Sequence, residues 1–227
     1  MTLPGTGFLA LWNDHADPDG DYDLWHGREH VPERLGIPGI LAVRRYLRTQ
    51  GSLPEWFTLY PVADLGVLAS APYRALLGNP TPASARMRPG FANFLRRGCD
   101  TVRSFGGGLG AGLAAAMPML APGADLARLD RLADFGPVLS AHLGRIDAGV
   151  QSVPFTMAEP VLPPNNAVLL VEAGSPEDLA PLLADIGAEL FAEGLVTAPP
   201  DWTLYRLRFA LTAGDAAAVP PPPGATP

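Results

Sequence analysis

The chain has 227 residues, of which 48% are hydrophobic and 17% are charged, and its formal net charge at pH 7 is −7. This composition supports a sizeable core in one large or two small domains, and the acidic balance argues against nucleic acid and anionic membrane surfaces as partners. All sixteen basic residues are arginine, which excludes reactions that need a lysine Schiff base or a P-loop lysine.

The first half of the chain is predicted to alternate between strands and helices. Apolar and β-rich runs indicate four strands, at 7–14, 39–49, 56–64 and 99–108. Helical patterns cover 21–37 and 65–78, and the stretch 79–98 is predicted to start as a loop and finish helical. The resulting order, β-α-β-β-α-β, is that of a ferredoxin-like unit.

The second half is predicted to repeat this order. Its expected strands are 112–122, 149–160, 167–174 and 201–211, and its expected helices are 125–144 and 175–194. Two matched pairs support the repeat: "AVLLV" begins 111 residues after "WFTLY", and His142 follows His30 by 112 residues. A repeat of this period predicts two copies of one fold in a single chain. We expect an α+β protein with units at 1–108 and 109–211, followed by a disordered Pro/Ala-rich tail at 212–227.

The expected compartment is the cytoplasm. The single cysteine, Cys99, excludes an intrachain disulfide and favours a reducing compartment. The first fourteen residues do not resemble a signal peptide, and no apolar run reaches the roughly 18 residues that a membrane span needs.

The stretch "WHGREHVPERLGIPG" (25–39) places two histidines, His26 and His30, four residues apart on one face of the predicted helix. One interpretation is a zinc site of the H-x-x-E-H type with Glu29 as base. Against it, Pro32 breaks the i→i−4 hydrogen-bond ladder within two residues of His30, and the sequence marks no third ligand, so no metal is expected. A second interpretation is acid–base chemistry by His30 or His26 near neutral pH. A third is an ordinary solvated helix face.

The segment "EHVPERLGIPGILAVRRY" (29–46) resembles the H-x-P…P-G segment of the EthD-like family in the dimeric α/β-barrel superfamily, through His30, Pro32, Pro38 and Gly39. The resemblance covers about residues 7–108, and the second half resembles the fold only through its element order. It implies two ferredoxin-like sheets packed as an intrachain α/β barrel, with a cleft between sheet and helices in each half. Relatives include cofactor-free monooxygenases, cyclases, isomerases, dehydratases and haem enzymes, so the fold does not select the reaction.

The histidines and aromatic residues gather in residues 1–108, so we place the active cleft there and give 109–211 a mainly structural role. Strand alternation puts Arg44 and Tyr46 on one face, and Trp56 and Tyr60 on one face of the next strand. The candidate catalytic residues are His30, His26 and Glu29, and the candidate substrate-binding residues are Tyr46, Tyr60, Arg44, Trp25, Trp12 and Trp56. A role for His142 as a haem ligand is not indicated, because its surroundings do not resemble a haem motif, and no cofactor is expected.

The function expected from these residues and the resemblance is a cofactor-independent lyase, cyclase or isomerase acting on a small aromatic or polyketide-like carbonyl compound, with His30 as general base. One alternative is a cofactor-free monooxygenase of the same fold, which would consume oxygen. Another is a non-catalytic binding or structural module. The expected partner is a small-molecule substrate, and the expected state is a monomer or homodimer.

Overall fold

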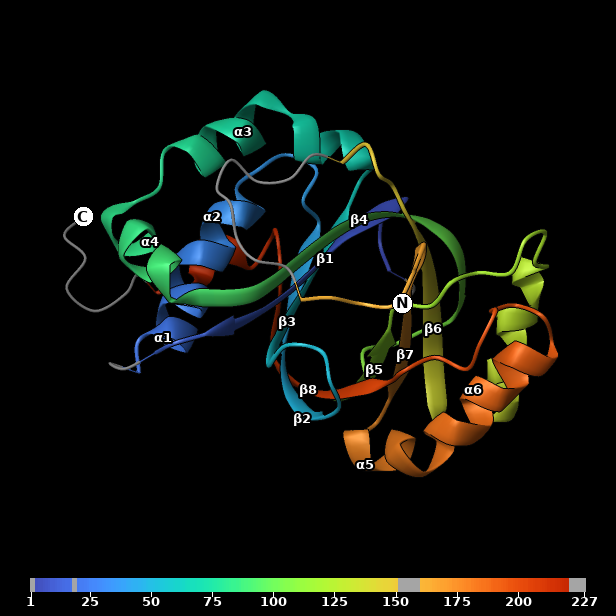
Figure 1. Cartoon of the computed structure of the whole chain (residues 1–227). Coiled ribbons are helices and arrows are strands. Elements are labelled where there is room, and N and C mark those ends of the chain that lie inside the picture. The colour runs from blue at the N-terminus through green and yellow to red at the C-terminus, as the bar shows by residue number, and fades with distance from the viewer. Residues whose placement is uncertain (1–2, 18–19, 151–159, 221–227) are drawn as a thin grey trace.

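Eight antiparallel strands close into a barrel in the order β1-β3-β2-β8-β5-β7-β6-β4 (Figure 1). The computed structural model describes residues 3–17, 20–150 and 160–220. The strands are β1 (Gly7–His15), β2 (Ala42–Gln50), β3 (Trp56–Val62), β4 (Phe91–Gly106), β5 (Gly112–Ala116), β6 (Val138–Ile146), β7 (Ala167–Ala173) and β8 (Thr203–Thr212).

The helices cover the outside of the barrel in two groups (Figure 1). The first group comprises α1 (Tyr22–Trp25), a π-helical segment (His26–His30), α2 (Val31–Leu35), a 3₁₀ helix (Leu65–Ala69), α3 (Ala71–Gly78), α4 (Pro82–Met87) and a 3₁₀ turn (Arg88–Gly90). The second comprises a 3₁₀ helix (Leu126–Asp134), α5 (Pro176–Leu179), a 3₁₀ turn (Ala180–Leu182) and α6 (Leu183–Ala192). Among the described residues, no helix has the length and apolar character to cross a membrane.

The two halves have the same strand order, which confirms the predicted tandem ferredoxin-like fold. The first half runs β4-β1-β3-β2 and the second runs β8-β5-β7-β6. β3 and β7 hold equivalent positions, as the matched "WFTLY" and "AVLLV" segments predict. The halves are joined where β2 pairs with β8 and β4 pairs with β6.

Alternation along each strand separates the barrel interior from the outer layers. Side chains from both halves fill the interior, among them Phe8, Trp12, Tyr46, Phe57, Leu170 and Tyr205. On the outer face of the first half, Val31 and Leu35 of α2 pack against Leu9 and Val62 of the sheet. On the second half, Ile186 and Leu190 of α6 belong to a separate apolar cluster with residues of β6 and β7.

A buried ion pair crosses the barrel interior between the halves. Arg44 Nη1 lies 2.6 Å from Glu172 Oε1, and the two side chains are 9% and 0% exposed. The other carboxylate oxygen of Glu172 accepts a hydrogen bond of 3.1 Å from the backbone N–H of Gly110. Burial by itself would raise the pKa of Glu172, but the neighbouring His142 and Arg44 and the Gly110 N–H hold it below the usual value.

The predicted helix at 125–144 is wrong. Only Leu126–Asp134 is helical, as a 3₁₀ helix, and β6 already begins at Val138. The dipeptide Gly136-Pro137 separates the two, because proline lacks the N–H that a continuing helix needs. The predicted strand at 149–160 lies mostly outside the described residues, since 151–159 are not described, and positions 149–150 form a turn. His142 therefore lies on a strand and is not the counterpart of the helical His30.

The stretch 79–98 also differs from expectation. It contains α4 and a 3₁₀ turn, and β4 begins at Phe91 instead of at Cys99. β4 spans 16 residues because its first part pairs with β1 and its second part pairs with β6. At the other end of the chain, the expected tail starts as the last residue of β8 and continues through a 3₁₀ turn, Ala216–Ala218. Residues 221–227 lie outside the described part.

The interior ion pair yields a stability prediction. We expect Arg44→Met to lower the free energy of unfolding by roughly 3–5 kcal/mol, because it leaves the carboxylate of Glu172 buried without its cation. The measurement is urea denaturation at pH 7.

The matched control is Arg206→Met, which breaks an exposed pair with Glu177 whose side chains are 46% and 67% exposed. That change should cost less than about 1 kcal/mol. The double variant Arg44→Met with Glu172→Gln should recover part of the loss. Equal effects of the two single variants would contradict a structural role for the interior pair.

Candidate active site

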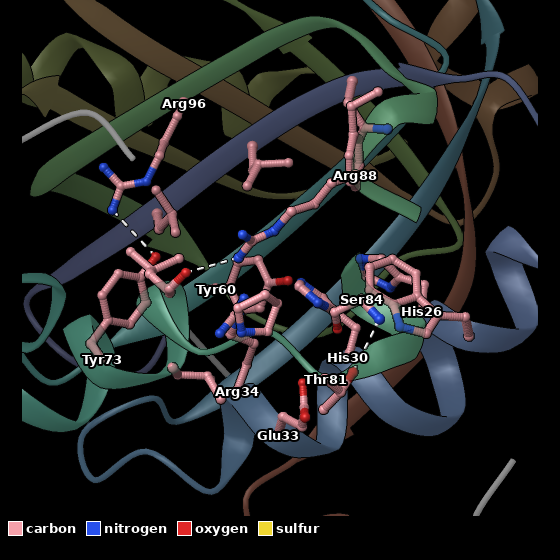
Figure 2. A pocket seen from close by; sticks show the side chains of 18 of the residues that line it. His26, His30, Glu33, Arg34, Tyr60, Tyr73, Thr81, Ser84, Arg88 and Arg96 are labelled. Atoms are coloured by element: carbon pink, nitrogen blue, oxygen red, sulfur yellow. Dashed lines mark hydrogen bonds between the residues drawn. The ribbon is translucent and has the colours of Figure 1, made fainter. Parts of the chain in front are cut away.

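A pocket lies between the first helical group and the outer face of β1, β3 and β4 (Figure 2). Its cavity volume is about 70 Å³, and the space that includes the open mouth is about 850 Å³. Most of the lining is apolar, with Leu9 and Leu11 from β1, Leu76 from α3, and Phe91 and Phe94 from β4. The polar side chains that line the pocket come from both the helices and the strands.

One helical stretch supplies both histidines. It runs without a break through α1, the π-helical segment and α2. In the π-helical segment the Val31 N–H donates to the carbonyl of His26, five residues back. Pro32 has no N–H to donate, and the wider π turn accommodates it without ending the helix. The i→i−4 ladder is thus interrupted next to Pro32, as predicted, and the predicted helix continues past it to Leu35.

His26 and His30 both line the pocket, with their ring centroids 5.0 Å apart. His26 is 3% exposed and His30 is partly exposed. The ring of Trp25 lies 4.7 Å from that of His30 and forms part of the same wall. Neither Nδ1 atom has a hydrogen-bond partner among the described residues.

Both histidines are neutral bases at pH 7. Burial lowers the pKa of His26 well below the usual value of 6.5, and the positive charge of Arg45 lowers it further. Burial likewise lowers the pKa of His30, followed by the charges of Arg34, Arg45 and Arg88. A neutral imidazole with an unoccupied ring nitrogen can accept a proton from a bound molecule.

Arg45, which the sequence did not single out, is a fully buried cation behind this wall. Its Nη1 donates to Thr58 Oγ1 at 2.8 Å, and its guanidinium lies 4.3 Å from the ring centroid of Trp56 and 5.0 Å from that of Tyr22. Over the described ranges no carboxylate pairs with it, and its Nε and Nη2 have no hydrogen-bond partner. Arg45 therefore adds positive potential to the site without itself lining the pocket.

The structure brings together four of the predicted site residues, namely His26, His30, Trp25 and Tyr60. Arg44, Tyr46 and Trp12 do not line the pocket, because they face the barrel interior. The predicted pairing of neighbours within each strand is sound, but the choice of face is wrong for β2. Arg44 pairs with Leu59 in the register and Arg45 with Thr58, so Arg45 and not Arg44 shares a face with Tyr60.

The candidates Trp56 and Glu29 do not line the pocket. Trp56 packs edge-on against Tyr22, with centroids 5.6 Å apart, and beneath Arg45. Glu29 accepts a hydrogen bond from the hydroxyl of Thr81 and does not line the pocket. In the described ranges no group of three or more His, Cys, Asp or Glu side chains is placed to hold a metal ion, so the H-x-x-E-H pattern has no third ligand there.

Sequence reasoning missed several pocket residues. Tyr22 and Glu33 precede and follow the histidines at helical spacing, and this periodicity was the signal that could have found them. Others come from α2, α3, the 3₁₀ turn after α4, and β4: Arg34, Tyr73, Arg88 and Arg96. The last two belong to the stretch whose secondary structure was mispredicted.

No protein-family model and no curated protein matches this sequence, so membership of the EthD-like family is not shown. Solved structures do match over nearly the whole chain. An anthrone oxidase-like protein is similar with a TM-score of 0.60 and 10% identity, over 95% of this chain and 97% of that chain. A protein provisionally named a monooxygenase, from Fusobacterium nucleatum, has a TM-score of 0.53 and 9% identity, over 92% and 95%.

A haem-binding protein from Thermus thermophilus is also similar, with a TM-score of 0.51 and 10% identity over 96% of each chain. These similarities show the fold, which is the dimeric α/β barrel built from tandem units. They raise the question of whether His142 fits a haem. Its ring is fully buried, its Nδ1 lies 3.0 Å from Ser104 Oγ, and its Nε2 lies 3.6 Å from Glu172 in the barrel interior. His142 does not face a cleft, so it does not fit the role of a haem ligand.

The lowered pKa of His26 predicts how stability depends on pH. The unfolded chain binds a proton on this histidine below about pH 6.5, whereas the folded protein keeps it neutral. Unfolding therefore takes up protons in that range, and the free energy of unfolding should fall as the pH is lowered from 7 toward 5. Denaturant titrations at several pH values measure this slope.

The variant His26→Phe should reduce the slope, because it removes one of the two histidines that take up a proton on unfolding. Arg28→Gln, an exposed change on the same helical stretch, should leave the slope as in the wild type. A slope that His26→Phe does not alter would show that His26 is not held neutral by the fold.

Proposed function

We propose that this protein is a cofactor-independent enzyme that removes a proton from a small aromatic or polyketide-like carbonyl compound and lets the deprotonated substrate react with molecular oxygen. The observation that carries the proposal is the pair of neutral histidines in an apolar pocket, each with an unpartnered Nδ1. Such a base can deprotonate a carbon next to a carbonyl at neutral pH, and the apolar lining limits access of water.

Three of the pocket residues have a defined part in this reaction. His30, partly exposed in the pocket, is the base. His26 stands behind it as a second proton acceptor. Burial raises the pKa of the Tyr60 hydroxyl, which stays protonated and can donate a hydrogen bond to the oxyanion that forms when the substrate loses its proton.

The reaction balances without a further reductant. A methylene group loses two hydrogens and gains one oxygen atom from O₂, and the second oxygen atom leaves as water. The electrons come from the substrate itself. The names of the similar structures support oxygen as the reactant, since they include an anthrone oxidase-like protein and a provisionally named monooxygenase.

The second candidate is the lyase, cyclase or isomerase reaction of the same deprotonated substrate. The feature that favours it is the separation of 5.0 Å between the rings of His26 and His30, since two adjacent bases can remove a proton at one carbon and return it at another. In both candidates residues 1–108 do the chemistry and residues 109–211 are mainly structural. The EthD-like resemblance of residues 29–46, centred on His30, belongs to this proposal.

The test uses anthrone as a probe substrate, with oxygen consumption and substrate loss followed in parallel. We expect oxygen-dependent turnover in the wild type. We expect His30→Gln to lower it by about 10²–10⁴-fold, the usual contribution of a general base. Arg28→Gln, exposed on the same helical stretch, is the control and should keep wild-type turnover.

The outcomes separate the candidates. Conversion of an enolisable aromatic substrate without oxygen uptake would replace the oxygenase with the isomerase or lyase. A folded His30→Gln variant with unchanged turnover would reject His30 as the base. A wild-type protein that binds aromatic compounds tightly and converts none of them would support the binding module.

A further inference from the structure

Part of the pocket lining is rich in guanidinium groups. Arg34, Arg88 and Arg96 line the pocket, and Glu33 is the one carboxylate among the lining residues described. Figure 2 shows Tyr73 and Arg96 on one side of the pocket and His26 on the other, with Arg34 and His30 between them. This positive character is local, because the whole chain carries a net charge of −7.

Tyr73 contacts two of these arginines. Its ring centroid lies 6.0 Å from Arg34 Cζ and 5.8 Å from Arg96 Cζ, and Arg96 Nη2 donates to its hydroxyl at 3.3 Å. Arg88 Nη2 donates to the carbonyl of Leu77 at 2.8 Å. These contacts fix the directions in which the guanidinium groups point.

Arg34 has a hydrogen-bond donor that a ligand can use. Its Nη1 is buried and has no hydrogen-bond partner, and across the described residues it forms no ion pair. A buried guanidinium nitrogen without an acceptor destabilises the fold, because it has lost its hydrogen bonds to water and forms none with the protein. The Arg34 side chain lines the pocket, so a ligand bound there can supply the missing acceptor.

We propose that the pocket binds an aromatic compound that carries a carboxylate or a phenolate, with Arg34, one helical turn after His30, as the partner of that anion. The apolar lining of the pocket receives the rings. This inference rests on the proposed function for the class of the substrate, but the anion site itself does not depend on turnover.

The geometry also links binding to the base. The charges of Arg34 and Arg88 lower the pKa of His30 in the free protein. An anion beside these arginines offsets their charge, so it raises the proton affinity of His30 once the substrate is in place. A neutral analogue would occupy the same lining without strengthening the base.

The test compares two probes of matched shape, 9-anthracenecarboxylate and the neutral 9-anthracenemethanol, by titration calorimetry with the full-length protein at pH 7.5. We expect the wild type to bind the carboxylate at least ten times more tightly than the alcohol. Arg34→Met keeps an unbranched side chain and removes the charge, and it should bring the two affinities within about threefold of each other. Its affinity for the alcohol should stay near the wild-type value, which also reports that the pocket is intact.

Two controls complete the design. Arg128→Met, on the second half, should keep the wild-type preference, and Arg34→Lys should keep part of it. If Arg34→Met does not fold, the decision falls to Arg34→Lys and to the loss of the preference in the wild type at high salt. Equal affinities of the wild type for the two probes, or a preference that survives in folded Arg34→Met, would overturn the proposal.

The variant His30→Gln separates this proposal from the proposed function. It should lose turnover and keep the preference for the carboxylate. If no substrate is turned over by the wild type and the preference is present, the anion site stands and the proposed reaction fails. If turnover depends on His30 and no preference is found, the reaction stands and the anion site fails.

Discussion

Closure of the sheet is the constraint from which the rest of this structure follows. Each half would leave two strand edges open, and an open edge carries unpaired backbone groups that tend to associate. The pairing of β2 with β8 and of β4 with β6 gives every strand two neighbours. The barrel interior is then filled by side chains from both halves, and the space for a ligand lies outside it, beneath the helices of the first half.

Two neighbouring residues of β2 point to opposite sides of the sheet. Arg44 points into the barrel and pairs with Glu172, while Arg45 points outward beside Tyr22 and Trp56. Both cations are buried, but only Arg44 has a carboxylate partner among the described residues. The inner cation therefore ties the halves together, and the outer cation contributes to the electrostatics that keep the histidines neutral. A shift of one residue in the register of β2 would exchange these roles.

Much of the architecture follows from local patterns in the sequence. The strands around "WFTLY" and "AVLLV", the helix opened by Ser175 and Pro176, and the tandem order were all predictable from apolar runs, turn residues and caps. The segment after residue 125 was not, because leucines three residues apart suit a 3₁₀ helix as well as an α-helix. In that segment the Gly136-Pro137 dipeptide is a stronger signal for the end of the helix than the leucine periodicity is for its continuation.

The candidate site was predictable only in part, for a different reason. Helical spacing is enough to bring His26 and His30 to one face, and the structure places both in the pocket. The face that a strand turns toward its helices depends on the register with its partners, which local sequence does not specify. The prediction for Arg44 and Tyr46 therefore has the wrong side of the sheet, and Arg88 and Arg96 lie in the stretch 79–98, whose predicted loop and helix differ from the observed turn and strand.

The fusion of the two units has a consequence for how such a protein can change. In a barrel made from two identical chains, symmetry repeats every substitution in both clefts. Here the equivalent positions belong to different parts of one polypeptide, so one copy can acquire chemistry while the other fills with apolar side chains. The second half shows this divergence. Its only histidine is buried in the barrel, and its outer face is occupied by residues such as Leu143, Leu169 and Ile186.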